Sequence, residues 1–394
     1  MTEPTTDTDS PGSGPGQPLS LTIFLADLGG GGAERMMVTI ANGLAARGAA
    51  VRMLLARAVG PYLSEVADDV EVTDLAAKGV TSAIPGLVAH LRTTRPDVLL
   101  TTLSHTSAAA LAARALAGTG TPVVVREANT PTAVSRSWSS PKDRLARLVI
   151  HKAYRQADGV IAVSDGVASA LREVVGVEQG KIATLYNPVV SPELDELAAL
   201  DPDHRWFDEG RPPVILGVGS LSQRKDFHTL IRAFDLVARQ TDARLVILGE
   251  GPQRESLEEL VVSLGLTDRV EMPGFKQNPF MYMARAKVYV LSSHLEGLPG
   301  SLVQALACGC PSVATDCPSG PFEILQGGAI GPLVDVGDHE AMAAAVLSQL
   351  QHPPPKERLV GAVVKYHADT VLDSMQAYLA AISSAQRRAS SRPG

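Results

Sequence analysis

Short apolar runs alternate with segments of helical periodicity along most of the chain. Four such runs, at residues 19–26, 51–56, 70–75 and 97–103, each end in polar or glycine-containing turns. Between them, apolar residues recur at the three- and four-residue spacing of a helix. Strands that alternate with helices predict a parallel, doubly wound α/β sheet with right-handed crossovers. The pattern restarts at residue 213, so we expect two such domains.

Changes in composition set the expected domain boundaries. Residues 1–18 are rich in Pro, Gly, Ser, Thr and Asp without an apolar core, which predicts a disordered leader and not a signal peptide. Residues 191–212 are Asp- and Pro-rich with weak periodicity, which is typical of a linker. The predicted ranges are an N-terminal domain at 19–190, a C-terminal domain at 213–362, a final helix at 363–385 and a disordered tail at 386–394.

Composition narrows the classes of function. The chain of 394 residues carries a formal net charge of −7, which argues against general binding to nucleic acid. Cys308, Cys310 and Cys317 form no CxxC pair, so we expect reduced thiols, no zinc site and a cytoplasmic protein. No uninterrupted apolar stretch is long enough to predict a transmembrane helix.

The segment 288–309, VYVLSSHLEGLPGSLVQALACG, contains the strongest functional pattern. It reads as a buried strand, a polar turn rich in Gly and Pro, and a short helix that ends at Gly309. Backbone N–H groups at such a strand-to-helix loop favour an anionic ligand. Glu296 lies in this loop, and a carboxylate suits the hydroxyl groups of a sugar held beside a phosphate. The segment therefore predicts a site for a sugar phosphate or a sugar nucleotide.

The motifs EGLPGSLVQALACG and PSVATDCPSGPFEIL resemble the donor site of the retaining GT-B glycosyltransferases of family 4, also called group 1. The resemblance implies two Rossmann-like domains that face a cleft, with the final helix returning to the N-terminal domain. It also implies that a hexose moves from a nucleotide sugar, with a UDP-sugar expected, to a hydroxyl of a glycan or lipid-linked saccharide. No metal or cofactor is expected. Two alternatives remain: a nucleotide-sugar-binding partner subunit with little catalysis, and a GT-B sugar-nucleotide epimerase.

In that family a first acid meets the transferred hexose and a second acid meets the ribose. The first corresponds to Glu296, whereas Gln304 stands at the second position and brings no charge. Its amide oxygen can still accept a hydrogen bond from a ribose hydroxyl. The alternative is that Ser301 and Gln304 form a capping box at the start of the helix.

Residues 213–234 repeat the strand, glycine turn and helix pattern, and they place Arg224 and Lys225 where the family binds the donor pyrophosphate. Cations held around a departing diphosphate stabilise its developing charge. The family's usual second cation is replaced by Ser220, and a plain surface Arg/Lys pair is the alternative.

The glycine run at 29–32 follows a strand but fits neither a GxGxxG fingerprint nor a P-loop, which disfavours a nicotinamide enzyme. Either it lies near the donor phosphates, as the resemblance implies, or it is only a tight turn. Phe275 and Lys276 stand where the family holds the base, although Phe275 could equally be a core residue. The full set of expected donor contacts is Gly30, Gly31, Gly32, Gly219, Arg224, Lys225, Gly251, Phe275, Lys276, Glu296, Gly297, Leu298, Pro299, Gly300, Ser301, Leu302 and Gln304.

Polar residues that follow two N-terminal strands are candidates for the reacting sugars. The family has a functional His where His105 stands, so the expected catalytic residues are His105, Glu296 and Lys225. A structural role is the alternative for His105. Arg126, Glu127 and Asn129 either meet the acceptor or belong to a solvated loop.

Basic and apolar residues are mixed in the segment 136–147. This composition suits peripheral contact with an anionic membrane surface. An ordinary amphipathic surface helix is the alternative, because the apolar face is short.

Overall fold

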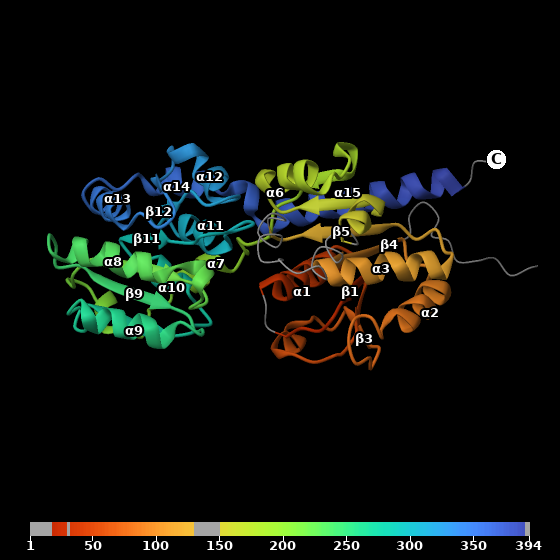
Figure 1. The fold of residues 1–394 in the computed structure, drawn as a ribbon, viewed down its shortest axis with the longest axis horizontal. Helices are drawn as coiled ribbons and strands as arrows, with labels where there is room; N and C mark the ends of the chain where they lie inside the picture. Colours follow the sequence, from red (N-terminus) through yellow and green to blue (C-terminus); the bar gives the residue numbers. More distant parts are fainter. Residues whose placement is uncertain (1–17, 30–31, 130–149, 391–394) are drawn as a thin grey trace, which may run out of the picture. The chain divides into compact units, whose positions relative to one another are not determined.

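The computed structural model describes residues 18–29, 32–129 and 150–390 (Figure 1). The first sheet has the strand order β3-β2-β1-β4-β5-β6-β7. Its strands are β1 (Ser20–Leu25), β2 (Ala50–Leu55), β3 (Glu71–Asp74), β4 (Val98–Thr102), β5 (Val123–Glu127), β6 (Gly159–Ala162) and β7 (Ile182–Thr184). β1 pairs in parallel with both β2 and β4, so the strand order reverses beside β1.

The second sheet has the order β10-β9-β8-β11-β12-β13, and all its pairings are parallel. Its strands are β8 (Val214–Val218), β9 (Arg244–Leu248), β10 (Val270–Gly274), β11 (Val288–Leu291), β12 (Ser312–Thr315) and β13 (Leu333–Val334). β8 pairs with β9 on one side and with β11 on the other. In such sheets ligands bind beyond the carboxyl ends of the strands at this reversal of order. The predicted strand and helix alternation is confirmed in both halves of the chain.

Helices connect the strands of both sheets. The described part of the N-terminal half includes α1 (Gly32–Ala45), α2 (Ile84–Thr94), α3 (Ser104–Ala117) and α6 (Asp165–Ala170), and residues 150–156 are also helical. Those that follow are α7 (Leu194–Ala199), α8 (Phe227–Ala238), α9 (Arg254–Ser263), α10 (Phe280–Met283), α11 (Gly300–Ala307), α12 (Pro321–Ile324), α13 (His339–Gln351), α14 (Lys356–Ala362) and α15 (Ala368–Ser390).

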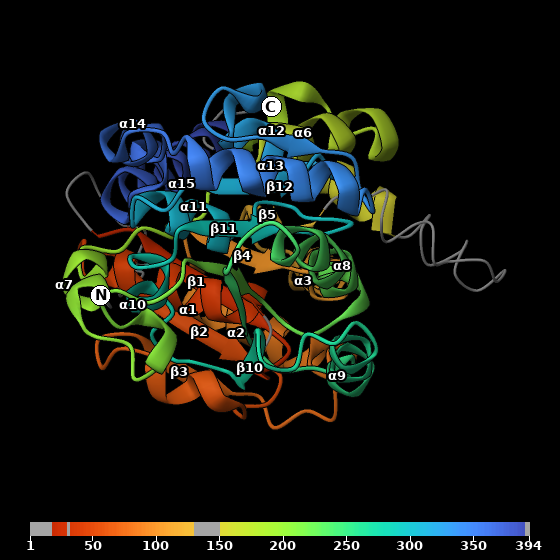
Figure 2. The same cartoon turned by 90° about the vertical axis from the view of Figure 1, so that its left-hand side faces the viewer.

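Alternation within the strands of the second sheet builds its core. Ile215, Ile247 and Val290 lie on one face and pack with apolar residues of α8, α9 and α13, which lie together on that side (Figure 2). The strand β11 is buried along its whole length. Burial on both faces explains why its sequence, VYVL, is a continuous apolar run without alternation.

By its internal contacts, the chain divides into two compact units. The first contains Met1–Thr101, Ala109–Val124 and Gln376–Gly394, and the second contains Thr102–Ala108 and Val125–Met375. The division falls within the segments around β4 and β5 and not at residues 191–212. The domain ranges expected from the sequence therefore stay a prediction.

Two segments are more ordered than the sequence predicts. The expected linker at 191–212 contains α7, whose Leu194 is buried, and a 3-10 turn with the buried Trp206. Helix α15 runs to Ser390, five residues into the predicted disordered tail. The polar stretch QRRAS continues the helix, since Gln, Arg and Ala favour helical backbone and Arg387 pairs with Asp97 near β4. Gln376 also donates to the backbone oxygen of Arg47, at 3.4 Å.

Candidate functional site

The loop after β8 forms one side of the candidate site. Gly219 follows the strand, and the 3-10 turn Gln223–Lys225 leads to Asp226, which caps the start of α8. Asp226 has a left-handed backbone, with φ 45°, and its side chain accepts hydrogen bonds from both the N–H and the hydroxyl of Thr229. This capping fixes the end of the loop that carries Lys225.

The loop after β11 forms the other side. It begins with Ser292 and Ser293, both buried, continues to Glu296, and ends at Gly300, where α11 begins. Because β8 and β11 are adjacent and parallel, their following loops lie at the same edge of the sheet.

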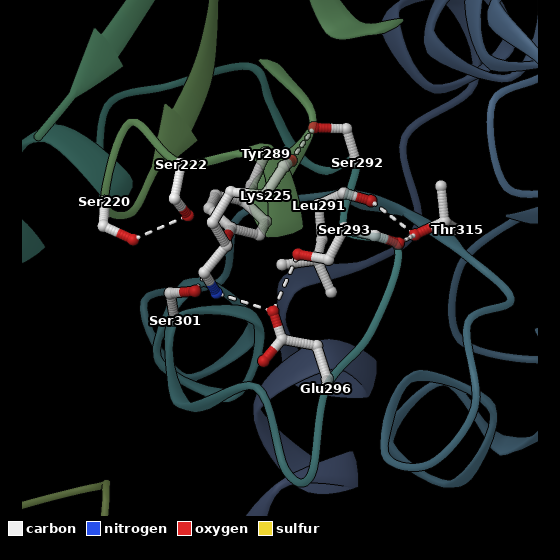
Figure 3. Close-up of polar contacts among 10 residues, drawn as sticks. All are labelled: Ser220, Ser222, Lys225, Tyr289, Leu291, Ser292, Ser293, Glu296, Ser301 and Thr315. Atoms are coloured by element: carbon white, nitrogen blue, oxygen red, sulfur yellow. Dashed lines mark hydrogen bonds and ion pairs between the residues drawn. The ribbon is translucent and has the colours of Figure 1, made fainter. Parts of the chain in front are cut away.

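An ion pair joins the two loops. Lys225 Nζ lies 2.6 Å from Glu296 Oε1, and only 12% and 7% of the two side chains are exposed (Figure 3). The hydroxyl of Ser293 donates to the same carboxylate oxygen, at 2.7 Å. The structure thus brings together two of the three residues that the sequence analysis expects to be catalytic.

Three further hydrogen bonds connect the same loops. Ser292 Oγ donates to the backbone oxygen of Lys225 at 2.8 Å, and the N–H of His294 donates to that of Arg224 at 2.8 Å. His294 Nε2 lies 2.7 Å from Asp226 Oδ2. The geometry of the site therefore depends on backbone as well as side-chain contacts.

Glycines permit close approaches around these loops. A Cβ atom on Gly219 would lie 3.2 Å from Lys225 Cε, so this glycine makes room for the lysine side chain. Gly249 has φ +146°, and a Cβ there would lie 1.9 Å from the backbone oxygen of Gly219. The expected donor residues Gly251 and Gly297 are similar: an added Cβ atom would lie 2.4 Å from the Leu221 backbone oxygen and 2.0 Å from the Ala128 backbone oxygen.

The contacts of Gln304 exclude the capping-box alternative. Helix α11 begins at Gly300, so its N-cap is Pro299 and not Ser301. No side-chain hydrogen bond caps this end of the helix. Ser301, already inside the helix, accepts a hydrogen bond from the Tyr289 hydroxyl at 2.8 Å. Gln304 Nε2 instead donates to the backbone oxygen of Val189 at 3.2 Å.

The other expected donor residues differ in exposure. Arg224 is exposed, and Phe275 is 68% exposed, so Phe275 is not a core residue. Lys276 is half-buried, whereas Leu298, Pro299 and Leu302 are buried. Gly32 is the exposed first residue of α1, and Gly30 and Gly31 lie outside the described residues.

Two of the acceptor candidates, Arg126 and Glu127, end the buried strand β5 and are not part of a solvated loop. Arg126 is 1% exposed and Glu127 is 8% exposed. Arg126 Nη2 donates to Asn187 Oδ1, and its Nε and Nη1 are buried without a hydrogen-bond partner among the described residues. Burial lowers the pKa of Arg126 to about 10. The site therefore holds a cation with unused donors.

Glu127 turns away from solvent beside this arginine. It accepts hydrogen bonds from the Tyr154 hydroxyl and from the Asn129 N–H, the latter at 2.9 Å. Burial raises the pKa of Glu127, an effect that these bonds and Arg126 oppose. Asn129 lies two positions after the end of β5 and is half-buried.

His105 is the second residue of α3 and is exposed. The segment 136–147, with its expected membrane contact, lies outside the described residues.

The three cysteines are buried, and the described residues include no group of side chains arranged as metal ligands. Cys308, Cys310 and Cys317 are buried free thiols, and burial raises the pKa of Cys308 and Cys317 to about 12. No group of three or more His, Cys, Asp or Glu side chains in the described part of the chain is arranged to hold a metal ion. Among the helices described here, none has the length and apolar character needed to cross a membrane.

Ser292 and four further polar residues of the site were not singled out from the sequence. Ser293, Asp226 and His294 bond within or between the two loops, and Thr315 at the end of β12 donates to the backbone oxygen of Ser293. Position supplied a signal for all but Asp226, which caps α8: the two serines and His294 follow the buried strand β11, and Thr315 ends the buried strand β12. What each side chain contacts depends on the pairing of distant strands.

Two doubly wound α/β sheets, with a cation and a carboxylate joined at the strand-order reversal of the second, are features expected of a GT-B protein that handles nucleotide sugars. Family models agree. The chain matches "Glycosyl transferase 4-like domain" at residues 31–188 and "Glycosyl transferases group 1" at residues 204–363, and it belongs to these GT4-type glycosyltransferases.

Two curated relatives match only part of the chain, at about 30% identity. An N-acetylgalactosaminyltransferase of Campylobacter jejuni that acts on N-acetylgalactosamine-N,N'-diacetylbacillosaminyl-diphospho-undecaprenol is 30% identical over 59% of this chain and 62% of its own length. The lipopolysaccharide core biosynthesis glycosyltransferase LpsE of Rhizobium meliloti is 29% identical over 49% of this chain and 54% of its own. The matched region thus spans less than two thirds of these curated relatives.

A solved structure shares the fold over nearly the whole chain. HepE of Anabaena, crystallised with UDP, has a TM-score of 0.73 and 19% identity, and the match covers 92% of this chain and all of HepE. The expected two-domain GT-B architecture is confirmed by this likeness together with the two sheets.

Proposed function

We propose that this protein is a metal-independent, retaining glycosyltransferase that moves a hexose from a UDP-sugar to a hydroxyl group of a saccharide acceptor. The observation that carries the proposal is the Lys225–Glu296 ion pair, built by the loops that follow β8 and β11. A cation beside a carboxylate suits a ligand that carries both a diphosphate and sugar hydroxyls. UDP is chosen as the nucleotide because HepE was crystallised with it.

In the proposed reaction, the bond between the sugar C1 and the diphosphate oxygen breaks while the acceptor oxygen bonds to C1 from the same face. The acceptor proton passes to the departing diphosphate. Lys225 would neutralise the charge that develops on the diphosphate, with Arg224 as a second cation in the same loop. Glu296 would hold hydroxyls of the hexose, and His105 would orient the donor and the acceptor.

The acceptor is proposed to be a glycan or a lipid-linked saccharide. The name of the Campylobacter relative includes a diphospho-undecaprenol carrier, and that of LpsE includes lipopolysaccharide core biosynthesis. Arg126 supports an acceptor role for the end of β5, because its guanidinium Nε and Nη1 are buried without partners among the described residues. Replacing Arg126 by Met should raise the KM for the acceptor at least tenfold and leave the affinity for the donor within about twofold.

The proposal is tested first by thermal unfolding with UDP, GDP, ADP and dTDP, each with Mg²⁺ and with EDTA. A ligand at a hundred times its Kd stabilises a protein by about 2.7 kcal/mol, which is several degrees here. Protection by UDP that persists in EDTA supports the metal-independent donor site. Protection by none of the four contradicts the proposal.

Transfer is then measured with the sugar forms of the protecting nucleotide and simple saccharide acceptors. The anomeric configuration of the product, read by NMR, tests retention. A purified chain that binds a nucleotide sugar but transfers nothing would favour a partner subunit without catalysis. The protein is also proposed to contact an anionic membrane surface through segment 136–147, and sedimentation with anionic vesicles tests this contact.

A further inference from the structure

Glu296 is held by the hydroxyl group of Ser293 as well as by Lys225, and the hydroxyl group of Thr315 in turn holds the backbone of Ser293. Ser293 Oγ donates to Glu296 Oε1 at 2.7 Å, and Thr315 Oγ1 donates to the backbone oxygen of Ser293 at 2.6 Å (Figure 3). Ser293 and Thr315 are both fully buried, at 0% exposure. The chain of contacts therefore runs from the end of β12, through the loop after β11, to the carboxylate.

Lys225 and Ser293 both donate to Glu296 Oε1, but a bound donor substrate would affect the two contacts differently. Lys225 has a flexible side chain, and its ammonium group would be shared with the diphosphate. The hydroxyl of Ser293 carries no charge and comes from a fully buried residue only three positions before Glu296. Its bond to the carboxylate can persist when Lys225 turns toward the phosphates.

We propose that Ser293 is a positioning residue for Glu296: its hydroxyl fixes Oε1 and thereby aims the carboxylate at the hydroxyls of the transferred hexose. This inference rests on the proposed function, because it assumes that Glu296 meets the sugar. Ser293 itself is buried and acts through Glu296, and Thr315 supports it by holding its backbone oxygen. Preorganised groups of this kind contribute most where the side chain would otherwise rotate freely.

A double-mutant cycle tests this role. The variants are Ser293→Ala, Glu296→Ala and both together, and the affinities measured are those for the protecting nucleoside diphosphate and for its hexose form. Ser293→Ala should weaken binding of the hexose form by about threefold to tenfold and leave the nucleoside diphosphate within about twofold. In the Glu296→Ala background the same substitution should have no further effect on either ligand.

Two more variants separate positioning from folding. Ser312→Ala removes a hydroxyl that is equally buried and donates to the Cys310 backbone oxygen at 3.0 Å, at the start of β12. It should leave both affinities unchanged. Thr315→Val keeps the side-chain shape and removes the donor to Ser293, so it should reduce affinity for the hexose form in the same direction, again only while Glu296 is present.

The outcomes are distinct. Equal losses from Ser293→Ala with and without Glu296, or equal losses for both ligands, overturn the positioning role and leave the proposed function standing. A wild-type protein that binds no nucleoside diphosphate and no nucleotide sugar overturns the proposed function and this inference together.

Discussion

Lys225 Nζ and Glu296 Oε1 lie 2.6 Å apart although 71 positions separate the two residues in the sequence. Both side chains are mostly buried, so removal of either one leaves the other charge buried without its partner in this ion pair. We expect Lys225→Ala and Glu296→Ala each to lower the free energy of unfolding by about 2–4 kcal/mol. The double variant should lose less than the sum of the two.

Urea unfolding of the three variants measures this coupling. Arg239→Ala is the matched control, because Arg239 pairs with Asp235 at the surface with 68% of its side chain exposed. Surface pairs contribute about 0–1 kcal/mol. Strictly additive losses for Lys225 and Glu296 would show that the two charges do not interact in solution.

Gln304→Glu restores the acid that the family carries at this position, yet the structure predicts a loss of stability. Gln304 Nε2 donates to the backbone oxygen of Val189, and a carboxylate would face that oxygen without a proton to donate. We expect a loss of about 1–2 kcal/mol in unfolding free energy at pH 7.5 and no gain in UDP affinity. Calorimetric titration with UDP and urea unfolding check the two parts. Tighter UDP binding with unchanged stability would contradict the role seen for this amide.

Gly249→Ala tests the close approach between two loops of the second sheet. A Cβ at residue 249 would lie 1.9 Å from the Gly219 backbone oxygen, and φ +146° is itself costly for alanine. We expect a loss of more than about 3 kcal/mol, or failure to fold.

Gly361→Ala is the control for Gly249→Ala, because Gly361 lies in α14 and a Cβ atom added there would meet nothing within 4 Å. It should change stability by about 1 kcal/mol or less, in the stabilising direction. A Gly249→Ala variant as stable as this control would mean that the approach to Gly219 is looser than observed.

The lowered pKa of His90 predicts that the free energy of unfolding declines at acid pH. Burial, aided by the positive charge of Arg52 and opposed by Glu71, lowers the pKa of His90 from 6.5 to about 4. Between these values the unfolded chain binds a proton and the folded chain does not, so this stability is complete above pH 6.5 and is lost as the pH falls toward 4. From pH 7.5 to pH 5 the contribution should fall by about 1–2 kcal/mol, since the ring is partly accessible to solvent.

The measurement is urea unfolding of the wild type and His90→Gln at both pH values. His90 Nε2 lies 3.0 Å from Thr22 Oγ1, and glutamine retains a polar group there. The unfolding free energy of His90→Gln should decline less than that of the wild type. The control His352→Gln, at an exposed position, should show the same decline as the wild type. Identical declines in wild type and His90→Gln would assign the pH dependence to other groups.

The sequence predicts the architecture well because strand, turn and helix signals are local. β11 and α11 were expected within the segment 288–309, and both lie there. The contacts of individual side chains were less predictable. Gln304 fitted a capping box by spacing alone, but the helix begins at Gly300, and its real partner, Val189, is 115 positions away.

The burial of individual polar side chains could not be predicted from the sequence either. Arg126 and Glu127 read as part of a polar loop, yet they end a buried strand whose neighbours in the sheet come from distant segments. Ser293 gave no signal beyond its place after a strand. Its role became visible only once β11 and β12 were paired, because the partner Thr315 lies 22 positions further along the chain.

The bonds between the loops after β8 and β11 also have a consequence for folding. Each of them spans more than sixty positions, so the candidate site cannot form from a local segment and must await the docking of β11 against β8. Contacts of such long range form slowly, because the intervening chain must first be ordered. The ability to bind a nucleotide would therefore report completion of the second sheet during refolding, and a chain that ends before β11 would lack the site even if β8 to β10 had formed.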